Sequence, residues 1–317
     1  MSVTGGGEER DGVALTNLDQ PLFEGADASK RDLVDYLDGM AGVLLPELRD
    51  RPLSVIRVLR GQAPFMQKNV PRYAPPWVRT VALWADASRR DVSYALCDDR
   101  RTLLWFANQR AVEYHPALVQ AARPGTPTHL VLDVDPPRDA FEAAVAAARL
   151  VRRALGDAGL EGALKTSGAK GLHVFVPLAD ATMDDVAAAA RALAARAERL
   201  DPALATTAFL REDRGGRVFL DSTRVGGATV VAAYSPRARP GVPVSFPLAW
   251  DELDGAAPGD FTVRTAARSL AARPSWADLM PDPQTLPRDL VEEGRAIPVA
   301  RVQAMHEGRR RARSRRR

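Results

Sequence analysis

The pattern of apolar and polar positions is most regular between residues 129 and 221. Four short apolar runs in this part of the chain predict strands at residues 129–134, 163–166, 172–177 and 217–221. Between them, residues 139–157 and 183–200 repeat apolar positions with the 3.6-residue period of an amphipathic helix. The resulting order, βαββαβ, predicts a ferredoxin-like unit. Such a unit usually has the sheet order 4-1-3-2, with the first strand beside the third and the fourth.

The first half of the chain is patterned less regularly. Ser29 followed by Asp32 predicts a helix cap, and apolar positions over residues 30–48 predict one amphipathic helix after it. Further elements are expected as strands at residues 53–59, 65–68, 80–85 and 92–96, and as helices at 102–113 and 264–272. The stretch Arg123-Pro124-Gly125-Thr126-Pro127 predicts a connection between two modules.

These elements predict one α/β (α+β) domain over residues 13–300. Its N-terminal mixed α/β module is expected at residues 13–125, and the module that contains the βαββαβ unit is expected at residues 126–300. Residues 1–12 are rich in glycine and charge, so we expect them to be disordered. The arginine-rich residues 301–317 are expected to form a basic disordered tail.

Composition restricts the class of protein. Of the 317 residues, 46% are hydrophobic and 26% are charged, as in soluble globular enzymes. The chain contains no run of about 18 apolar residues, and its start lacks the apolar centre of a signal peptide. We therefore expect a cytoplasmic protein without a membrane partner. The single cysteine, Cys97, excludes an internal disulfide framework and a multi-cysteine zinc site.

Basic residues are distributed unevenly along the chain. Seven arginines and one glutamate in residues 306–317 contribute +6 to a formal net charge of +4, so the rest of the chain carries −2. Overall charge therefore does not predict nucleic-acid binding by the folded part, although the tail could hold phosphate backbones nonspecifically. Only four of the 44 basic residues are lysines, which makes these the candidates for phosphate contacts: Lys30, Lys68, Lys165 and Lys170.

Two aspartates end the first strand of the βαββαβ unit. Asp133 and Asp135 are two residues apart, so their side chains point to the same face of the strand. Two carboxylates about 5 Å apart repel each other by roughly 3 kcal/mol at an intermediate dielectric, and a cation between them relieves the repulsion. Hard oxygen ligands favour Mg²⁺ or Mn²⁺. The alternative is a solvated acidic turn at the end of a strand.

The expected sheet order brings further polar residues to this pair. It places the strand that carries Asp133 beside the strand of His173 and beside the strand of Asp221. Side chains that lie far apart in the sequence are thereby expected to form one polar cluster.

A glycine-containing turn, Ser167-Gly168-Ala169-Lys170-Gly171, joins the second and third strands of this unit. Glycines let backbone N–H groups approach an anion closely, and a hydroxyl, an ammonium and the imidazole of His173 add side-chain donors. The turn is therefore expected to hold a di- or triphosphate. It is not a Walker A loop, because the spacing G-x-x-x-x-G-K is absent. The alternative is an ordinary hairpin turn with Lys170 in solvent.

Four segments together resemble the polymerase domain of bacterial ligase D, in the archaeo-eukaryotic primase superfamily: LVLDVDPP, TSGAKGLHVFVPL, VFLDSTR and AAYSPRARPGVPVSFPLAWDEL. The resemblance implies a primase-polymerase catalytic core with a ferredoxin- or RRM-like βαββαβ palm packed on the N-terminal module. It also implies a nucleotidyltransferase that adds nucleotides, preferably ribonucleotides, to a 3′-hydroxyl in non-homologous end joining. Two Mn²⁺ or Mg²⁺ ions would serve as cofactors.

The resemblance assigns roles to particular residues. The metal-binding and catalytic carboxylates would be Asp133, Asp135 and Asp221. The nucleotide would be contacted by Ser167, Lys170, His173, His115 and Arg237. On the DNA side, Lys30 would contact a 5′-phosphate, Phe65 would stack on the template, and Lys68 would touch a phosphate.

This sequence departs from the family pattern at three places. Gln20 replaces the second lysine of the 5′-phosphate pocket, and Met66 replaces the second stacking aromatic residue. The run 222–228 after Asp221 is one residue shorter and lacks an asparagine. These changes leave the metal carboxylates intact and affect the recognition of DNA ends and the positioning of the nucleotide.

The implied partners follow from what the chain contains. They are DNA ends or gapped DNA with a 5′-phosphate, and NTP or dNTP substrates. The ligase motif K-x-D-G fails at Leu33, so ligation would need a separate DNA ligase, and an end-binding protein is expected beside it. We expect a nucleoid-associated monomer.

Two other functions remain open at this point. A catalytically weak DNA-end-binding scaffold would explain the altered run after Asp221 and the arginine tail. A phosphatase that uses the first aspartate as its nucleophile would explain the D-x-D pair, although Pro136-Pro137 and the separate phosphate turn argue against it.

Overall fold

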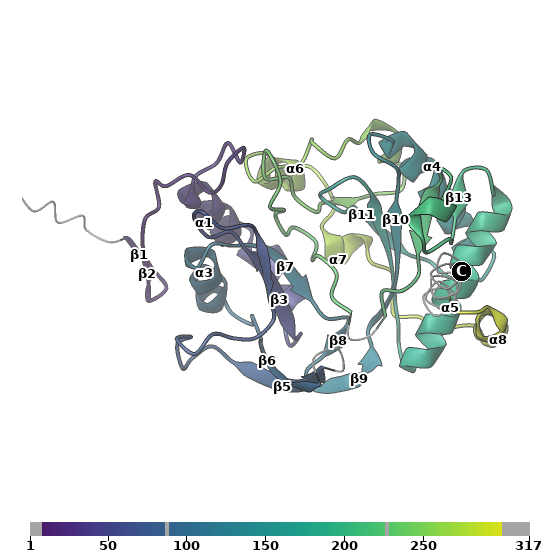
Figure 1. Ribbon diagram of the computed structural model, residues 1–317, viewed down its shortest axis with the longest axis horizontal. Helices are drawn as coiled ribbons and strands as arrows, with labels where there is room; N and C mark the ends of the chain where they lie inside the picture. The colour runs from purple at the N-terminus through teal and green to yellow at the C-terminus, as the bar shows by residue number, and fades with distance from the viewer. Residues whose placement is uncertain (1–7, 86–88, 226–227, 300–317) are drawn as a thin grey trace, which may run out of the picture.

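The computed structural model describes residues 8–85, 89–225 and 228–299, which fold around two separate β-sheets (Figure 1). The first sheet has the spatial order β4 (Phe65–Gln67), β3 (Leu53–Arg57), β6 (Arg90–Ala95) and β5 (Thr80–Ala85), and β7 (Ala111–Pro116) pairs with β3. The second sheet has the order β13 (Ala205–Thr206), β14 (Val218–Asp221), β10 (His129–Asp135), β12 (Leu172–Pro177), β11 (Ala163–Thr166) and β15 (Pro247–Leu248).

The second sheet confirms the ferredoxin-like order. Its four central strands, β14, β10, β12 and β11, are the fourth, first, third and second strands of the βαββαβ unit, and all pair antiparallel. The two-residue strands β13 and β15 extend the sheet at its edges and were not predicted. The mixed α/β fold class is therefore confirmed.

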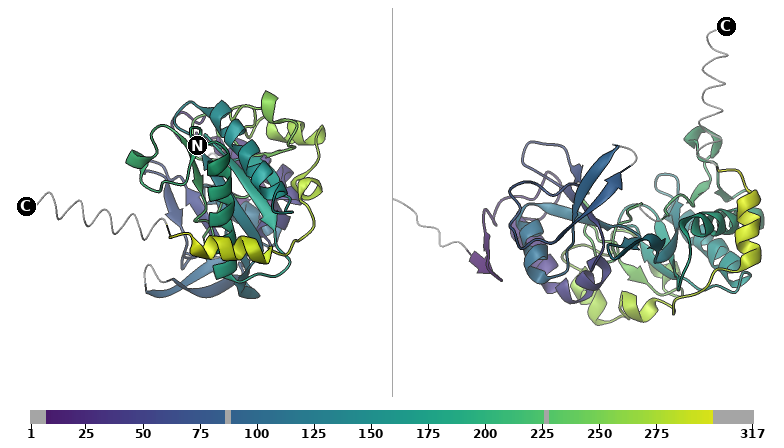
Figure 2. Two further views of the ribbon diagram at one scale, coloured as in Figure 1. Left: turned by 90° about the vertical axis from the view of Figure 1, so that its right-hand side faces the viewer. Right: turned by 90° about the horizontal axis from the view of Figure 1, so that it is seen from below.

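Helices cover the outer face of the second sheet. The helices α4 (Phe141–Gly156) and α5 (Met183–Leu200) pack on β10, and α8 (Arg288–Ala296) crosses α5 further out (Figure 2). The buried faces of α4 and α5 consist largely of alanine, which lets the helices lie close to the sheet. On β10 itself, Asp133 interrupts a run of fully buried apolar residues from Leu130 to Val134, and Asp135 ends the strand.

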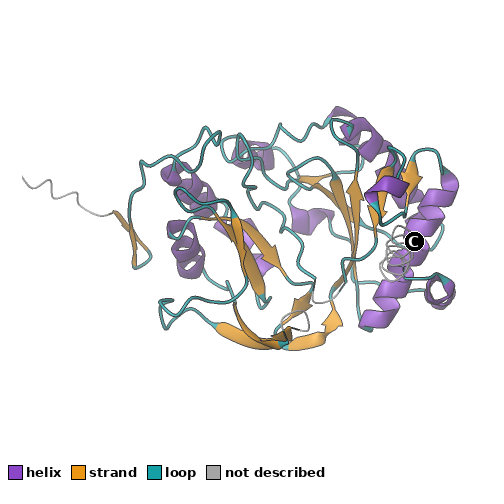
Figure 3. Ribbon diagram, viewed as in Figure 1, coloured by secondary structure: helices purple, strands orange, loops and turns teal. Residues whose placement is uncertain are grey.

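The N-terminal part contains three helices, α1 (Lys30–Gly39), α2 (Ala41–Leu48) and α3 (Arg100–Asn108). Of these, α1 and α3 lie on the side of the first sheet away from the second (Figure 3), whereas Glu47 of α2 lines a small cavity together with Lys165 of the second sheet. The expected cap is confirmed, because Ser29 and Asp32 form a capping box at the start of α1. The prediction of a single helix over residues 30–48 is wrong. Its first part ends at Gly39 and a second helix begins at Ala41, since glycine has low helix propensity.

The helix expected over residues 102–113 is also corrected. It ends at Asn108, and residues Ala111–Pro116 form β7. Val112 and Tyr114 have the β-branched and aromatic side chains that favour a strand, and both are fully buried. Pairing with β3 therefore outweighs the local helical pattern.

The N-terminal disorder expected for residues 1–12 does not hold for residues 8–12. These residues belong to a hairpin of β1 (Glu8–Arg10) and β2 (Val13–Leu15). The hairpin is held by the Arg10 guanidinium, which lies 2.6 Å from Asp35 and 3.1 Å from Asp38. Residues 1–7 and the expected basic tail lie outside the described residues.

The remaining elements are short. The expected connection at residues 123–127 forms a strand, β9 (Arg123–Pro127), paired with β8 (Val119–Gln120). Two short helices follow the second sheet in the sequence, α6 (Ala266–Ala271) and α7 (Trp276–Leu279), and 3₁₀ turns occur at Arg211–Asp213 and Leu253–Gly255. Among the described residues, no helix is both long enough and apolar enough to span a lipid bilayer.

A buried segment connects the two halves of the molecule. Tyr36 of α1 donates a hydrogen bond to the carbonyl of Tyr234 at 2.8 Å, and the backbone N–H of Tyr114 donates to Ser235 Oγ at 2.8 Å. One continuous hydrophobic cluster contains residues of both sheets, such as Leu53 and Leu130. The division near residue 125 stays a prediction.

Candidate active site

The strand register brings the first aspartate of the D-x-D pair to the centre of a polar cluster. Asp133 on β10 lies directly opposite His173 on β12, and on its other side directly opposite Asp221 on β14. Asp135 lies two residues further along β10, on the same face. The proximity expected from the sheet order is therefore confirmed. We call the three carboxylates of Asp133, Asp135 and Asp221 the acid edge.

An arginine that the sequence did not mark lies between two of these acids. The Arg224 guanidinium places Nη2 3.5 Å from Asp133 Oδ2 and Nε 3.4 Å from Asp221 Oδ2. Asp221 also accepts hydrogen bonds from the backbone N–H and the hydroxyl of Thr223, at 2.9 and 2.6 Å. Burial alone would raise the pKa of Asp133, but His173 and Arg224 lower it, so this carboxyl is ionised.

Asp135 has cations of its own. Lys170 Nζ lies 2.9 Å from Asp135 Oδ1 and also donates to the carbonyl of Pro136 at 2.7 Å. Arg214 Nη1 lies 3.8 Å from Asp135 Oδ2. The turn at residues 167–171 and the acid edge are therefore in direct contact through Lys170.

The acid edge suits a hard divalent cation in its donor chemistry, since carboxylate oxygens are the ligands that Mg²⁺ and Mn²⁺ prefer. As the side chains stand, however, no three His, Cys, Asp or Glu residues within the described ranges are grouped as a metal-binding set. Arg224 supplies positive charge to Asp133 and Asp221 instead. The residues thus fit a metal chemically, and Arg224 is a cation that competes for the same oxygens.

The turn at residues 167–171 is shaped by one hydroxyl and two glycines. Ser167 Oγ accepts hydrogen bonds from the backbone N–H groups of Ala169 at 3.2 Å and Gly171 at 3.1 Å. Gly168 has φ +64°, a conformation that favours glycine. A Cβ at Gly171 would lie 2.2 Å from the carbonyl oxygen of Val134 on β10. The turn can therefore lie against the strand of the acid edge only because this position is glycine.

A glutamate that the sequence did not mark joins His115 and Arg237 to this turn. Glu113 Oε2 lies 2.8 Å from His115 Nε2 and accepts from Arg237 Nε at 2.9 Å. Arg237 also donates to the carbonyl of Ser167. Glu113 and His115 share a face because both lie on β7, and this relationship was hidden while residue 113 was assigned to a helix.

The protonation of Glu113 gives a testable link between pH and stability. Burial alone would raise its pKa, but the hydrogen bonds from His115 and Ala238 and the charge of Arg237 lower it to about 2. Because the pKa is depressed on folding, the stabilisation is present above about pH 4.5 and is lost as pH falls toward 2. Urea unfolding should show Glu113→Gln losing up to roughly 3 kcal/mol at pH 7 and clearly less at pH 3. An equal loss at both pH values would contradict this assignment.

His173 is buried beside the acid edge, with its Nε2 3.5 Å from Asp133 Oδ1. Burial, reinforced by the positive charge of Lys165, lowers the pKa of His173 to about 4. The imidazole is therefore neutral at pH 7.

Lys30 is not presented to solvent. Its residue is 3% exposed, and its ammonium donates to the carbonyl of Thr16 and to Asn108 Oδ1, both at 2.6 Å. Burial, together with the charge of Arg110, lowers the pKa of Lys30 to about 8. In this structure the lysine connects three segments of the N-terminal part.

The other residues assigned to DNA lie on β4 and just after it, at one edge of the first sheet. Phe65 is half-buried, with the Arg57 guanidinium 5.9 Å from the centre of its ring. Met66 is 44% exposed, and Lys68 is exposed. The structure therefore places these residues on an open sheet edge, on different elements from the acid edge.

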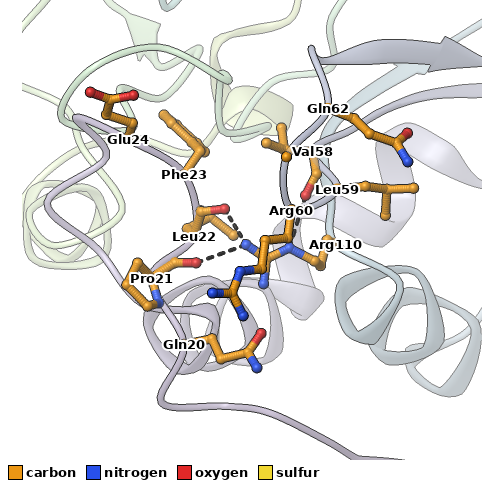
Figure 4. A pocket seen from close by; sticks show the side chains of 11 residues that line it. Gln20, Pro21, Leu22, Phe23, Glu24, Val58, Leu59, Arg60, Gln62 and Arg110 are labelled. Carbon is orange, nitrogen blue, oxygen red and sulfur yellow. Dashed lines mark hydrogen bonds between the residues drawn. The ribbon is translucent and has the colours of Figure 1, made fainter.

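Gln20 lines a cavity of about 510 Å³ in the N-terminal part (Figure 4). Arg60 and Arg110 line the same cavity. Arg110 Nε donates to the carbonyl of Val58 at 2.8 Å, and its Nη2 donates to the carbonyl of Pro21 at 2.8 Å. The position where the family pattern has a lysine thus faces a pocket that contains two arginines.

Comparison with known proteins gives a consistent result. Residues 29–277 match a family model described as LigD, primase-polymerase domain. The bifunctional non-homologous end joining protein LigD of Bacillus subtilis (strain 168) is 34% identical over 260 residues, covering 80% of this chain and 41% of that protein. The multifunctional non-homologous end joining DNA repair protein LigD of Mycobacterium tuberculosis (strain ATCC 25618 / H37Rv) is 36% identical over 256 residues, covering 76% of this chain and 33% of that protein.

The chain thus spans between one third and two fifths of the length of these curated relatives. Among solved structures, the polymerase domain of Mycobacterium tuberculosis ligase D in complex with DNA superposes with a TM-score of 0.77. The two chains are 31% identical, and the match covers 87% of this chain and all of that one. The matched family model, the related sequences and the shared fold together show that this chain belongs to the LigD primase-polymerase family of DNA-directed nucleotidyltransferases.

Proposed function

We propose that this protein is a metal-dependent nucleotidyltransferase that adds nucleotides to a 3′-hydroxyl at DNA ends or gaps during non-homologous end joining. The observation that carries the proposal is the position of Asp133, which lies in register between His173 and Asp221, on the strand whose Val134 and Asp135 contact the turn at residues 167–171. Nucleotidyl transfer needs acidic ligands next to a phosphate-binding loop, and three carboxylates next to a glycine-containing turn support this role for the sheet edge.

The acid edge would hold two Mn²⁺ or Mg²⁺ ions, which activate the 3′-hydroxyl and neutralise charge on the triphosphate when bound. The chain's own donors would bind and orient that triphosphate. Lys170 lies beside Asp135, so its ammonium could contact the phosphate group that a metal on Asp135 would bind. The neutral imidazole of His173 would contact the triphosphate as well. Arg237 and His115 would contact the nucleotide as a pair, because both are bound to the carboxylate of Glu113.

On the DNA side we propose that Phe65 and Lys68 contact the template strand. Aromatic stacking contributes about 1–3 kcal/mol per base, and Met66 beside Phe65 adds packing without a π face. Lys30 would reach a 5′-phosphate only by exchanging its bonds to Thr16 and Asn108. That a relative's polymerase domain was solved in complex with DNA supports a DNA substrate for this chain.

The preference for ribonucleotides, a separate DNA ligase and an end-binding protein belong to the same proposal. One assay tests its core: extension of labelled, gapped primer-template DNA with and without a 5′-phosphate, with each nucleotide set and each metal. We expect template-directed incorporation that needs Mn²⁺ or Mg²⁺. DNA binding without incorporation under any metal would overturn the proposal and indicate a non-catalytic end-binding scaffold.

The position of Arg224 predicts an unusual response to mutation. Arg224→Gln should bind Mn²⁺ about threefold to tenfold more tightly than the parent, because a competing, partly exposed cation leaves the acid edge. Electron paramagnetic resonance of free Mn²⁺ during a titration measures this directly. Arg288→Gln, which removes an arginine that is 94% exposed on α8, is the matched control and should leave the titration unchanged. Unchanged or weaker Mn²⁺ binding by Arg224→Gln would contradict the prediction.

A further inference from the structure

One buried lysine has no part in the mechanism described so far. Lys165 on β11 is fully buried and lies directly opposite His173 on β12. An isolated buried ammonium is strongly unfavourable, so a lysine in this place requires specific partners. Burial, together with the charge of Arg237, lowers its pKa well below the usual range.

The hydrogen bonds around Lys165 have a defined direction. Ser245 Oγ donates its hydrogen to the carbonyl of Thr166 at 2.7 Å. The same hydroxyl must therefore act as the acceptor toward Lys165 Nζ, which lies 2.6 Å away. The second partner of Nζ is His173 Nδ1, at 2.9 Å. Ser245 thus orients the amine toward the ring.

This arrangement determines which ring nitrogen of His173 carries the proton. An ammonium has three N–H donors and no acceptor, so it can only donate to Nδ1; a neutral amine keeps two N–H donors and gains one lone pair, which could accept from Nδ1–H only if an unprotonated Nε2 faced Asp133. In either charge state Lys165 can donate to both Ser245 Oγ and His173 Nδ1. The neutral imidazole then carries its hydrogen on Nε2, and this nitrogen faces Asp133 Oδ1 at 3.5 Å. The Nε2–H group is directed at the acid edge, where an acceptor nitrogen would be repelled by the carboxylate.

We propose that Lys165 is a positioning residue that fixes His173 in the Nε2–H tautomer, so that the imidazole offers a hydrogen-bond donor to the phosphate oxygens of the nucleotide. The benefit to the nucleotide rests on the proposed function above. The control of the tautomer does not, because it follows from contacts within the protein alone. Lys165 acts through His173 and does not itself touch the substrate.

The tautomer can be measured without any substrate. Long-range ¹H–¹⁵N spectra separate protonated from unprotonated ring nitrogens, and the chain has only four histidines, so His173→Gln assigns the signals of this ring. We expect the parent at pH 7 to show a protonated Nε2 and an unprotonated Nδ1. In Lys165→Met, which keeps the length of the side chain, the Nδ1–H form or the doubly protonated ring should appear.

Controls and a second variant keep the test decisive. Lys68→Met makes the same chemical change at an exposed position and should leave the His173 signals unchanged. If Lys165→Met does not fold, Ser245→Ala removes the group that orients the amine and should weaken the preference for Nε2–H. A parent protonated on Nδ1, or a folded Lys165 or Ser245 variant with an unchanged tautomer, would overturn the inference.

A kinetic measurement tests the second part of the proposal, that His173 donates a hydrogen bond to the nucleotide. In primer extension, Lys165→Met should raise KM for the nucleotide about tenfold and change kcat less than threefold, because His173 would lose the Nε2–H donor that contacts the bound nucleotide. Rescue of KM by Lys165→Arg, which retains N–H donors, would support the same role. A fall in kcat with unchanged KM would overturn it. If the parent incorporates no nucleotide at all, the proposed function fails, and the spectra still decide whether Lys165 sets the tautomer.

Discussion

Asp133→Asn is expected to lower the rate of nucleotide incorporation at least about 1000-fold. The change keeps the size of the side chain but removes the charge at the centre of the acid edge, between His173 and Asp221. Loss of a carboxylate that binds catalytic metal removes several kcal/mol of transition-state stabilisation. Gel extension of a primer-template in Mn²⁺ measures the rate, and the melting temperature checks that the variant is folded.

A matched control is available six residues further along the chain. Asp139 is exposed and has φ +57°, a conformation that asparagine tolerates well, so Asp139→Asn is the same chemical change outside the site. It should extend primers as fast as the parent. If Asp133→Asn kept more than a tenth of the parent rate, Asp133 could not be a metal-binding catalytic residue.

Gly294→Ala is expected to cause the largest loss of stability among conservative substitutions in the helices. A Cβ at Gly294 of α8 would lie 1.8 Å from the carbonyl oxygen of Ala188 on α5, and neither atom belongs to a flexible side chain. To accommodate this Cβ, α8 must move away from α5. The ion pairs of Glu293 on α8 with Arg196 and Arg199 on α5 oppose that movement. We expect a loss of about 2–3 kcal/mol, in the range of overpacked cores.

Gly156→Ala serves as the control for this prediction. Gly156 is also a helical glycine, at the end of α4, but a Cβ there would meet no atom within 4 Å. Alanine in a helix is favoured over glycine by about 0.5–1 kcal/mol, so this variant should be neutral or slightly more stable. Urea unfolding with equal midpoints for the two variants would contradict the packing described for α5 and α8.

The part of the fold that the sequence predicted best is the second sheet. Its four central strands are short, mainly apolar runs, and its helices carry alanine at regular spacing, so each element was visible locally. The βαββαβ order predicted the order of the strands, and with it the proximity of Asp133, His173 and Asp221. The strand pairing confirms this proximity.

The elements that were missed depend on contacts between distant segments. The strands β13 and β15 have two residues each, which is too few to show a period. Residues 111–113 continued a helical pattern locally, and only pairing with β3 makes them a strand. Glu113 was therefore not predicted as a site residue, because its side chain lies on the same face as that of His115 only when both residues are in a strand.

The partners of the site residues were equally hidden. Nothing in the sequence relates Arg224 to Asp133, or Ser245 to Lys165, because ladder pairing across the sheet and a return of the chain after residue 228 bring them together. Lys165 was marked only by the scarcity of lysine in the chain. Sequence patterns therefore located the acids and the glycine-containing turn, while the structure supplied the ion pairs and hydrogen bonds that connect them.

Anomalous diffraction tests the central claim most directly, on crystals grown with Mn²⁺ and a non-hydrolysable nucleoside triphosphate. We predict manganese peaks about 2.0–2.3 Å from the carboxylates of Asp133, Asp135 and Asp221, with Arg224 displaced and the triphosphate at the turn of Ser167. The account would be contradicted if Arg224 stayed between Asp133 and Asp221, no manganese bound to the three acids, and the nucleotide lay elsewhere.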